Sequence, residues 1–171
     1  FAKLVFSKFK EGLGIVDTEY FVTAAAPMNK DVHRWFHAIG IDVTEIYGMT
    51  EDTGPATIGV PGNAVESFEK RLKVDSIEVP SVLNPIGKVG IPIPGTEVKV
   101  MEDGELCIKG NHVAQGYFKS EEQTKETFDS DGWLHTGDLA EIDDEGYVKI
   151  IGRKKEILIT SAGKNIAPVE V

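Results

Sequence analysis

Residues 20–47 restrict the fold of this chain more than any other stretch, because one helical segment lies there between two β-favouring segments. The segment 20–24 is rich in strand-forming side chains, and Asn29 is a typical helix N-cap. Gly40 is a typical residue at a helix end, and a second β-favouring segment, 43–47, follows at once. Short joints between strand, helix and strand are typical of a βαβ unit. The sequence therefore predicts a helix between two parallel strands.

The predicted helix carries an apolar stripe and two histidines. The apolar residues recur at positions i, i+3, i+4 and i+7, and we expect them to pack on the sheet: Val32, Trp35, Phe36 and Ile39. His33 and His37 lie four residues apart, a spacing that can bind a metal ion, but the sequence places no third ligand near them. We therefore expect both histidines on a solvated face of the helix.

The rest of the chain predicts a surface excursion and then β structure. Residues 54–84 are interrupted by Pro and Gly and contain one amphipathic helical segment, so we interpret them as the excursion. From residue 87 onward, alternating segments flank the turn sequences 103–104 and 144–146, which predicts two antiparallel hairpins. The alternation in the first hairpin places Cys107 on the polar face, and it places four residues on the inner face: Val98, Val100, Leu106 and Ile108.

These patterns predict an α/β part followed by a β part. Residues 1–86 would end an α/β subdomain that holds the βαβ portion of a parallel sheet. Residues 87–151 would form an antiparallel, barrel-like β subdomain, and residues 152–171 a hinge and the start of a small C-terminal α+β domain. The chain begins with Phe1 and stops within its last predicted helix, which would start at residues 166–171, and this favours a piece of a longer polypeptide.

Composition restricts the partners of the chain. With 18 Lys+Arg against 28 Asp+Glu, its formal net charge is −10, which argues against a nucleic-acid surface built from clustered Lys and Arg. No stretch reaches the ~20 apolar residues that cross a bilayer, and no secretory signal is recognisable. The single cysteine cannot form an internal disulfide. We therefore expect a cytoplasmic protein, with peripheral contact with a membrane as the alternative.

Side chains that can bind a nucleotide follow the second predicted strand. In the stretch Tyr47-Gly48-Met49-Thr50-Glu51, an aromatic ring can stack on a base, a hydroxyl can bind phosphate and a carboxylate can hold Mg²⁺. Further along, Asp138 offers a carboxylate to two vicinal hydroxyls, and Arg153 offers a cation to phosphate. Together these residues predict a nucleotide site, whereas the first stretch alone could be a simple capped turn.

Six motifs in order resemble those of the adenylate-forming acyl-CoA synthetases, most closely the long-chain fatty acyl-CoA ligases, including the bubblegum type. The motifs are residues 47–51, 104–110, 116–117, 132–138, 152–154 and 161–166. The resemblance runs from about residue 4 to residue 171. It implies that ATP and a fatty acid give acyl-AMP and pyrophosphate, and that coenzyme A then displaces AMP to give a thioester.

The resemblance also implies a role for each matching residue of the nucleotide site. Tyr47 would stack on adenine, beside Gly48 and Met49, with the backbone of three residues on its other face: Ala25, Ala26 and Pro27. The catalytic residues would be Thr50 on the α-phosphate, Glu51 on Mg²⁺ and Arg153 on ribose and phosphate. The ribose would lie against Asp138, which would accept both hydroxyls, and against Ile150.

The last part of the chain would serve the transfer to coenzyme A. The resemblance places Lys155 at the hinge between a large and a small domain, and it places three residues on the coenzyme A path: Ser161, Ala162 and Gly163. Relatives often have Gly-Gly-Ala-Pro where residues 24–27 are Ala-Ala-Ala-Pro.

Two catalytic parts of such ligases have no match in this sequence, namely a phosphate loop with its lysine and a late lysine of the small domain. The isolated chain is therefore expected to be inactive. Two alternatives stay open: an adenylating enzyme that passes the acyl group to a carrier protein or an amine, and a non-catalytic nucleotide-binding fragment.

Overall fold

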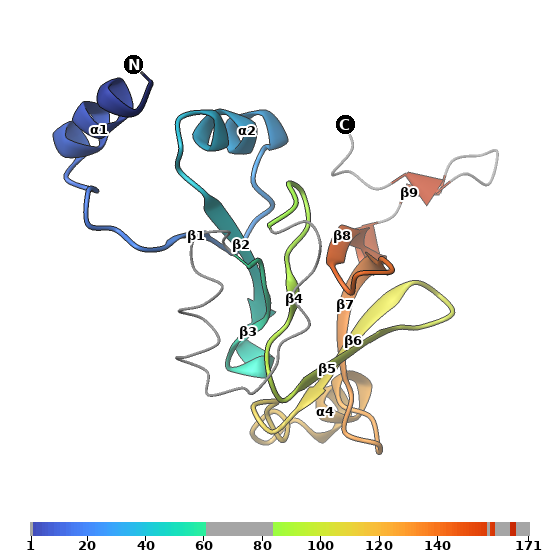
Figure 1. Ribbon diagram of the computed structural model, residues 1–171. Helices are drawn as coiled ribbons and strands as arrows, with labels where there is room; N and C mark the ends of the chain where they lie inside the picture. The colour runs from blue at the N-terminus through green and yellow to red at the C-terminus, as the bar shows by residue number, and fades with distance from the viewer. Residues whose placement is uncertain (1, 61–83, 157, 160–164, 167–171) are drawn as a thin grey trace.

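The computed structural model describes residues 2–60, 84–156, 158–159 and 165–166 (Figure 1). Two four-stranded sheets make up most of this part of the chain. The first has the order β1 (Phe21–Thr23), β2 (Val43–Met49), β3 (Gly54–Ile58), β4 (Ile91–Pro92). The second has the order β5 (Thr96–Val100), β6 (Glu105–Gly110), β7 (Leu134–Ile142), β8 (Val148–Arg153).

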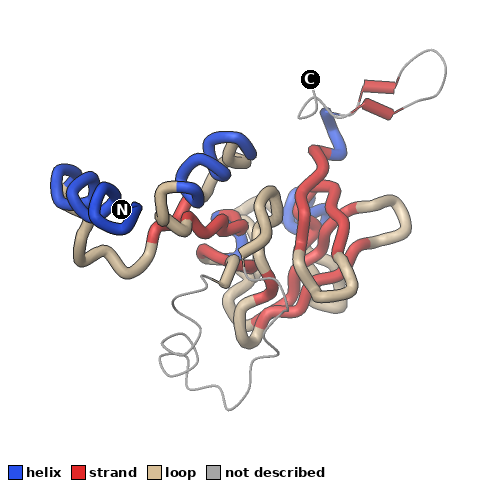
Figure 2. Tube along the Cα trace, turned by 45° about the horizontal axis from the view of Figure 1, so that its top comes forward, coloured by secondary structure: helices blue, strands red, loops and turns tan. Residues whose placement is uncertain are grey.

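The helices and a small third sheet complete the described elements. The helices are α1 (Ala2–Leu13), α2 (Lys30–Ala38) and α4 (Glu121–Thr127), with short 3₁₀ turns η1 (Thr50–Asp52) and η2 (Lys154–Glu156). Two short antiparallel strands form the third sheet: β9 (Leu158–Ile159) and β10 (Asn165–Ile166). In both views α1 and the β9–β10 pair lie at opposite ends of the molecule (Figure 2).

The predicted βαβ unit is confirmed. Strands β1 and β2 are parallel, with Phe21 opposite Val43, and α2 connects them. The Asn29 side chain caps α2 by accepting hydrogen bonds from the backbone amides of Asp31 and Val32. Local signals were sufficient here because the cap and the strands are encoded within a few residues.

The side of α2 that faces the sheet was predicted wrongly. His33 is fully buried, and its Nε2 lies 2.7 Å from the carbonyl oxygen of Val43. Its Nδ1 lies 3.4 Å from Oε1 of Glu45. The Trp35 side chain of the expected stripe is 52% exposed. Phe36 and Ile39 of the stripe are half-buried, so the prediction fails for Val32 and Trp35, and the polar His33 occupies the buried side instead.

The expected surface excursion at 54–84 is wrong in its first part. Residues 54–58 form β3, which pairs antiparallel with β2, and Thr57 is fully buried with its hydroxyl donating to the carbonyl oxygen of Val89 at 2.7 Å. Pro55 has no backbone N–H to donate to the neighbouring strand. It lies where the register of the β2–β3 pair shifts, and proline is tolerated at such irregularities. The first sheet is therefore mixed. Residues 61–83, with the predicted amphipathic segment, lie outside the described residues.

Both predicted hairpins of the β part are confirmed, and the second sheet is antiparallel throughout. Leu106 and Ile108 are fully buried, as expected, but Cys107 is buried as well. Cys107 pairs with Lys99 on one side and His135 on the other, and its Sγ lies 3.5 Å from Nδ1 of His135, so neighbouring side chains take the place of water on this face. Ile166, expected to begin a helix, lies in β10, and residues 167–171 are outside the described part.

Hydrogen bonds join the segment before β4 to the second sheet. The Val89 amide donates to the carbonyl oxygen of Val148, and the Val148 amide donates to that of Gly90, both at 2.8 Å. Val89 and Val148 also belong to a buried apolar cluster against which Tyr47 packs. Among the helices that the structure describes, none is long and apolar enough to cross a membrane.

Candidate functional site

A cavity of about 200 Å³ lies between the two four-stranded sheets. Its wall comes from the loop after β1 and from strands β2, β7 and β8. The wall includes nine residues that the sequence selected for the nucleotide site: Ala25, Ala26, Pro27, Tyr47, Gly48, Met49, Asp138, Ile150 and Arg153. The fold therefore brings together segments that are far apart in the chain.

Three polar side chains of this wall are tied together. The Tyr47 hydroxyl donates to Oδ2 of Asp138 at 2.7 Å, and Nε of Arg153 donates to Oδ1 at 2.9 Å. Burial, together with the neighbouring Asp138, raises the pKa of the Tyr47 phenol far above its ordinary value. The charge of Asp138 also raises the pKa of Arg153. Tyr47 is thus a neutral donor, and its ring is fixed in the cavity.

This arrangement leaves binding capacity on both charged groups. Each carboxylate oxygen has two lone pairs, so each oxygen of Asp138 can accept one further hydrogen bond. The Arg153 side chain is 60% exposed, and among the described residues its terminal nitrogens make no hydrogen bond. The cavity therefore offers an acceptor for two hydroxyls next to a cation for an anionic group.

Thr50 and Glu51 lie beside this cavity rather than in its wall. They form η1 directly after β2, and Thr50 is exposed. Asp52 closes the turn by accepting hydrogen bonds from the amides of Met49 at 3.0 Å and Gly54 at 3.1 Å. Burial raises the pKa of the Asp52 carboxyl. Asp52 supports the turn that presents Glu51, and the sequence analysis did not select it.

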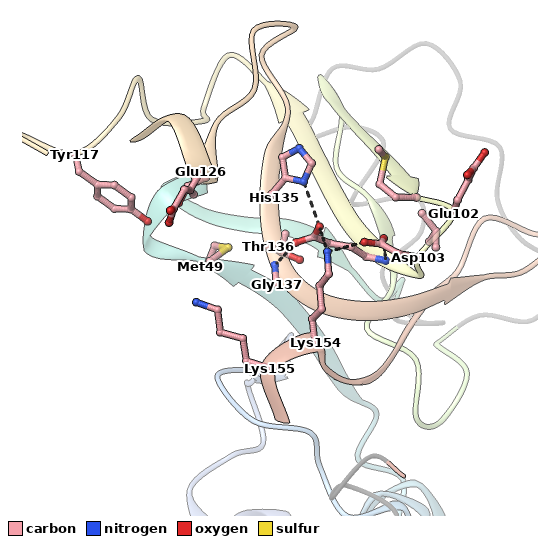
Figure 3. Close-up of a pocket in the computed structure, with 14 residues that line it drawn as sticks. Met49, Glu102, Asp103, Tyr117, Glu126, His135, Thr136, Gly137, Lys154 and Lys155 are labelled. Atoms are coloured by element: carbon pink, nitrogen blue, oxygen red, sulfur yellow. Dashed lines mark hydrogen bonds and ion pairs between the residues drawn. The ribbon is translucent and has the colours of Figure 1, made fainter. Parts of the chain in front are cut away.

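A second and more open pocket of about 1080 Å³ contains Met49 and Lys155 in its wall. Figure 3 shows Tyr117 and Glu126 toward one end of it and Asp103 toward the other, with Lys155 projecting between them. Lys155 itself lies in η2, which follows β8 without a break. The predicted coenzyme A residues 161–163 lie outside the described residues.

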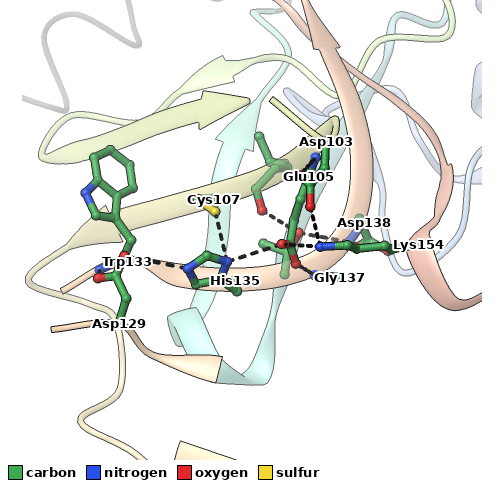
Figure 4. A network of polar contacts seen from close by, with 11 residues as sticks. Asp103, Glu105, Cys107, Asp129, Trp133, His135, Gly137, Asp138 and Lys154 are labelled. Carbon is green, nitrogen blue, oxygen red and sulfur yellow. Dashed lines mark hydrogen bonds and ion pairs between the residues drawn. The ribbon is translucent and has the colours of Figure 1, made fainter. Parts of the chain in front are cut away.

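A polar cluster at the side of this pocket joins β6, β7 and η2 (Figure 4). Glu105 accepts a hydrogen bond from the Gly137 amide at 2.9 Å, and its Oε2 lies 3.2 Å from Nδ1 of His135. The ammonium group of Lys154 donates to the same oxygen at 3.1 Å. Burial raises the pKa of Glu105, but these three contacts outweigh it and hold the pKa below its ordinary value.

The ligand atoms of Glu105, Cys107 and His135 lie within 4.8 Å of one another, which is close enough for the three groups to contact one metal ion. Lys154 already neutralises the Glu105 carboxylate, however. Burial also raises the pKa of the Cys107 thiol to about 11, so the thiolate that a metal requires is disfavoured. The cluster is therefore satisfied as an ion-paired link between strands.

Glu45 is a cavity residue that the sequence analysis missed. It is buried in β2 and lies in the wall beside Tyr47, and the Met28 amide donates to its Oε2 at 3.4 Å. The sequence did offer a signal, because Glu45 is an acidic residue inside a β-favouring segment. Acidic residues are rarely buried in a strand unless they have polar partners.

Comparisons with known proteins show the family of the chain. The AMP-binding enzyme family matches residues 7–118. The chain is 38% identical over 172 residues to long-chain-fatty-acid–CoA ligase ACSBG2 of Xenopus laevis, covering 98% of the chain and 21% of that protein. It is 36% identical over 168 residues to long-chain-fatty-acid–CoA ligase FadD15 of Mycobacterium bovis, covering 98% of the chain and 24% of that protein.

A solved structure gives the same result at the level of the fold. The o-succinylbenzoate CoA synthetase of Bacillus subtilis, in complex with its acyl-adenylate intermediate, superimposes with a TM-score of 0.71 at 26% identity. The superposition covers 90% of this chain and 29% of that one. The chain thus spans about a quarter of the length of the curated relatives it matches.

Proposed function

The chain belongs to the AMP-binding enzyme family, and we propose that it forms part of an ATP-dependent ligase that joins a long-chain fatty acid to coenzyme A. The observation that carries the proposal is the cavity in which Tyr47, Asp138 and Arg153 meet. Relatives named as long-chain-fatty-acid–CoA ligases support the substrate class. We also propose that the protein works in the cytoplasm.

The cavity suits the adenosine part of ATP or AMP. The fixed Tyr47 ring can stack on adenine beside the backbone of residues 25–27, and Ile150 can pack on the ribose. Asp138 can accept the two ribose hydroxyls with the lone pairs that Tyr47 and Arg153 leave open. The terminal nitrogens of Arg153 can reach ribose and phosphate oxygens. Gly48 and Met49 complete the wall next to the base.

In the first half-reaction, an oxygen of the fatty-acid carboxylate bonds to the α-phosphorus of ATP, and the bond from that phosphorus to the pyrophosphate oxygen breaks. Negative charge grows on the phosphate oxygens, where the Thr50 hydroxyl and the Arg153 guanidinium can stabilise it. Glu51 keeps one carboxylate oxygen that accepts no hydrogen bond from any described residue, and this hard oxygen suits Mg²⁺. When bound, Mg²⁺ supplies positive charge against the phosphates.

In the second half-reaction, the sulfur of coenzyme A bonds to the acyl carbon, the bond from that carbon to the phosphate oxygen of AMP breaks, and the thiol proton is released to water. We propose that residues 152–171 begin a small domain that turns about Lys155, and that Ser161, Ala162 and Gly163 line the coenzyme A path. The α/β subdomain at 1–86 and the β subdomain at 87–151 would form the large-domain side. A hinge lets one site present different residues to two different reactions.

Binding of AMP to the 171-residue chain tests the site directly. We expect AMP to bind in the millimolar range, about −4 kcal/mol, because the chain holds only part of the site. The matched control is 2′,3′-dideoxy-AMP, which lacks both hydroxyls and should bind measurably more weakly in ligand-observed NMR. Asp138→Ala should remove the difference between the two nucleotides. Equal binding of both by the unchanged chain would contradict the ribose assignment.

The chemistry is tested in the complete ligase that contains this chain. Exchange of pyrophosphate into ATP, dependent on a long-chain fatty acid, should occur. AMP release should then require coenzyme A. Absence of exchange would favour a non-catalytic nucleotide-binding protein, and exchange without coenzyme A dependence would favour another acyl acceptor. In this ligase, Asp138→Ala should raise the ATP concentration needed for half-maximal activity. The rise should correspond to a loss of about 1.5–3 kcal/mol in the free energy of ATP binding.

A further inference from the structure

We propose that Tyr117 is a positioning residue whose hydroxyl holds the Glu51 carboxylate in the orientation that binds Mg²⁺ with ATP. The Tyr117 hydroxyl donates to Oε1 of Glu51 at 2.7 Å, across 66 residues of sequence. This inference rests on the proposed function, because it takes Glu51 as the metal-binding carboxylate.

The chemistry of the two groups sets the direction of the hydrogen bond between Tyr117 and Glu51. A carboxylate oxygen can only accept, so the O–H of Tyr117 points toward Oε1 of Glu51. Tyr117 therefore acts as a donor to Oε1 and leaves Oε2 available on the other side.

The loop between β6 and α4 holds Glu51 by its backbone as well. The Ala114 amide donates to the carbonyl oxygen of Glu51 at 2.7 Å. The same loop is itself anchored, since the Tyr117 amide donates to Oγ1 of Thr124 at 2.9 Å and the Tyr117 ring packs edge-on to Phe128 at 5.7 Å. Glu51 is thus held at two atoms by one anchored loop.

The position of Tyr117 explains why the structure needs this contact. Tyr117 and Met49 lie in the wall of the same open pocket (Figure 3), and the Glu51 carboxylate contacts the hydroxyl of that wall residue. A glutamate side chain there would otherwise sample several rotamers and lose entropy on binding a cation. Removing a partner that orients a metal ligand typically weakens metal binding or activity by 10- to 100-fold.

The test replaces Tyr117 by Phe, which keeps the ring contact with Phe128 and removes only the hydroxyl. In the complete ligase, with ATP present and the fatty acid absent, we measure Mn²⁺ binding by EPR. We expect Tyr117→Phe to weaken Mn²⁺ binding about tenfold and to raise the Mg²⁺ concentration for half-maximal pyrophosphate exchange by the same factor. The KM for the fatty acid should stay unchanged. The control Phe118→Leu, at a side chain that is 90% exposed on the same loop, should match the unchanged protein.

Glu51→Gln separates failure of this inference from failure of the proposed function. If Glu51→Gln binds Mn²⁺ with ATP as well as the unchanged protein does, the metal assignment in the proposed function is wrong. If Glu51→Gln weakens binding and Tyr117→Phe does not, the inference on Tyr117 is overturned. In the Glu51→Gln background, Tyr117→Phe should have no further effect on Mn²⁺ binding. An equal further loss in that background would indicate a general structural role and would also overturn it.

Discussion

Ala25 has a left-handed backbone with φ = +72°, at a wall position of the cavity between the sheets. An L-residue with a Cβ pays roughly 1–2 kcal/mol for this conformation, whereas glycine adopts it without strain. Ala25 therefore carries a backbone strain that the glycine expected there from the family resemblance would not have.

We expect Ala25→Gly to raise the free energy of unfolding of the chain by about 1 kcal/mol, because it removes this strain. Urea denaturation measures the change. The matched control is Ala26→Gly, because the neighbouring Ala26 does not have a positive φ. This substitution should leave the chain equally stable or less stable. Equal gains from both substitutions would contradict the strain at Ala25.

Glu105 gives the chain a pH dependence. Its contacts hold its folded-state pKa below the ordinary value of 4.5. A lowered carboxyl pKa contributes stability above the unfolded pKa, and that stability is lost as pH falls through the folded pKa. We expect the unfolding free energy of the chain to fall below about pH 4.5 more steeply than that of Glu105→Gln.

Urea denaturation at a series of pH values between neutral and about pH 3 measures this difference. The control is Glu141→Gln, whose side chain is 64% exposed in a surface pair with Lys149 and should leave the pH curve nearly unchanged. Parallel curves for the unchanged chain and Glu105→Gln would show that the Glu105 contacts do not link protonation to folding.

At the scale of elements, the pairing of β2 with β3 shapes the site. The register of the pair shifts between Tyr47 and Gly48. A Cβ on Gly48 would lie 1.8 Å from the carbonyl oxygen of Gly54, which is backbone and has no rotamer with which to move away. The two strands can approach this closely only because Gly48 has no side chain, so the positions of Tyr47 and Glu51 on either side of it depend on this glycine.

We expect Gly48→Ala to lower the free energy of unfolding by about 1–3 kcal/mol, because the strands must separate to admit the methyl group. AMP binding should weaken in the same variant. Gly12→Ala is the matched control, since a Cβ there meets nothing within 4 Å, and it should be neutral or stabilising in helix α1. Urea denaturation and ligand-observed NMR check both. If Gly48→Ala changed neither the free energy of unfolding nor AMP binding, the close approach of the strands would not require glycine.

At the scale of the whole molecule, β8 ties the cavity to the segment that follows it. Arg153 ends β8 and binds Asp138 of β7, and η2 with Lys155 begins at the next residue. A change of backbone angles at Lys155 can therefore redirect the following chain while Arg153 stays in the nucleotide cavity. This is the geometry that the proposed hinge requires.

We expect Lys155→Pro in the complete ligase to keep acyl-AMP formation within about tenfold, ~1.4 kcal/mol, because it fixes φ without touching the cavity. Thioester formation should fall at least about a hundredfold, ~2.7 kcal/mol, since one orientation is blocked. Pyrophosphate exchange and acyl-CoA production measure the two reactions separately. Lys155→Ala, which leaves φ free, should retain both. Equal losses in the two reactions of Lys155→Pro would exclude a hinge at this residue.

The predictions that proved correct depend on short stretches of sequence. The cap at Asn29, the turns at 103–104 and 144–146 and the parallel strands around α2 are encoded by neighbouring residues. The nucleotide-site residues came from local motifs and from the family resemblance; nine of them line one cavity, and their roles stay predictions. The predictions that failed concern which side chains are buried. Periodicity in the sequence indicates burial only when one face of the helix or strand meets water.

The sequence by itself determined the class of the elements and the chemical groups available for a nucleotide. Only the tertiary structure decided which of these groups meet. Tyr47 and Asp138 are 91 residues apart, and Glu51 and Tyr117 are 66 apart. It also decided that His33 and Cys107 are buried, because other segments cover them. Burial and polar partners result from contacts between distant segments, and no local period of the sequence encodes such contacts.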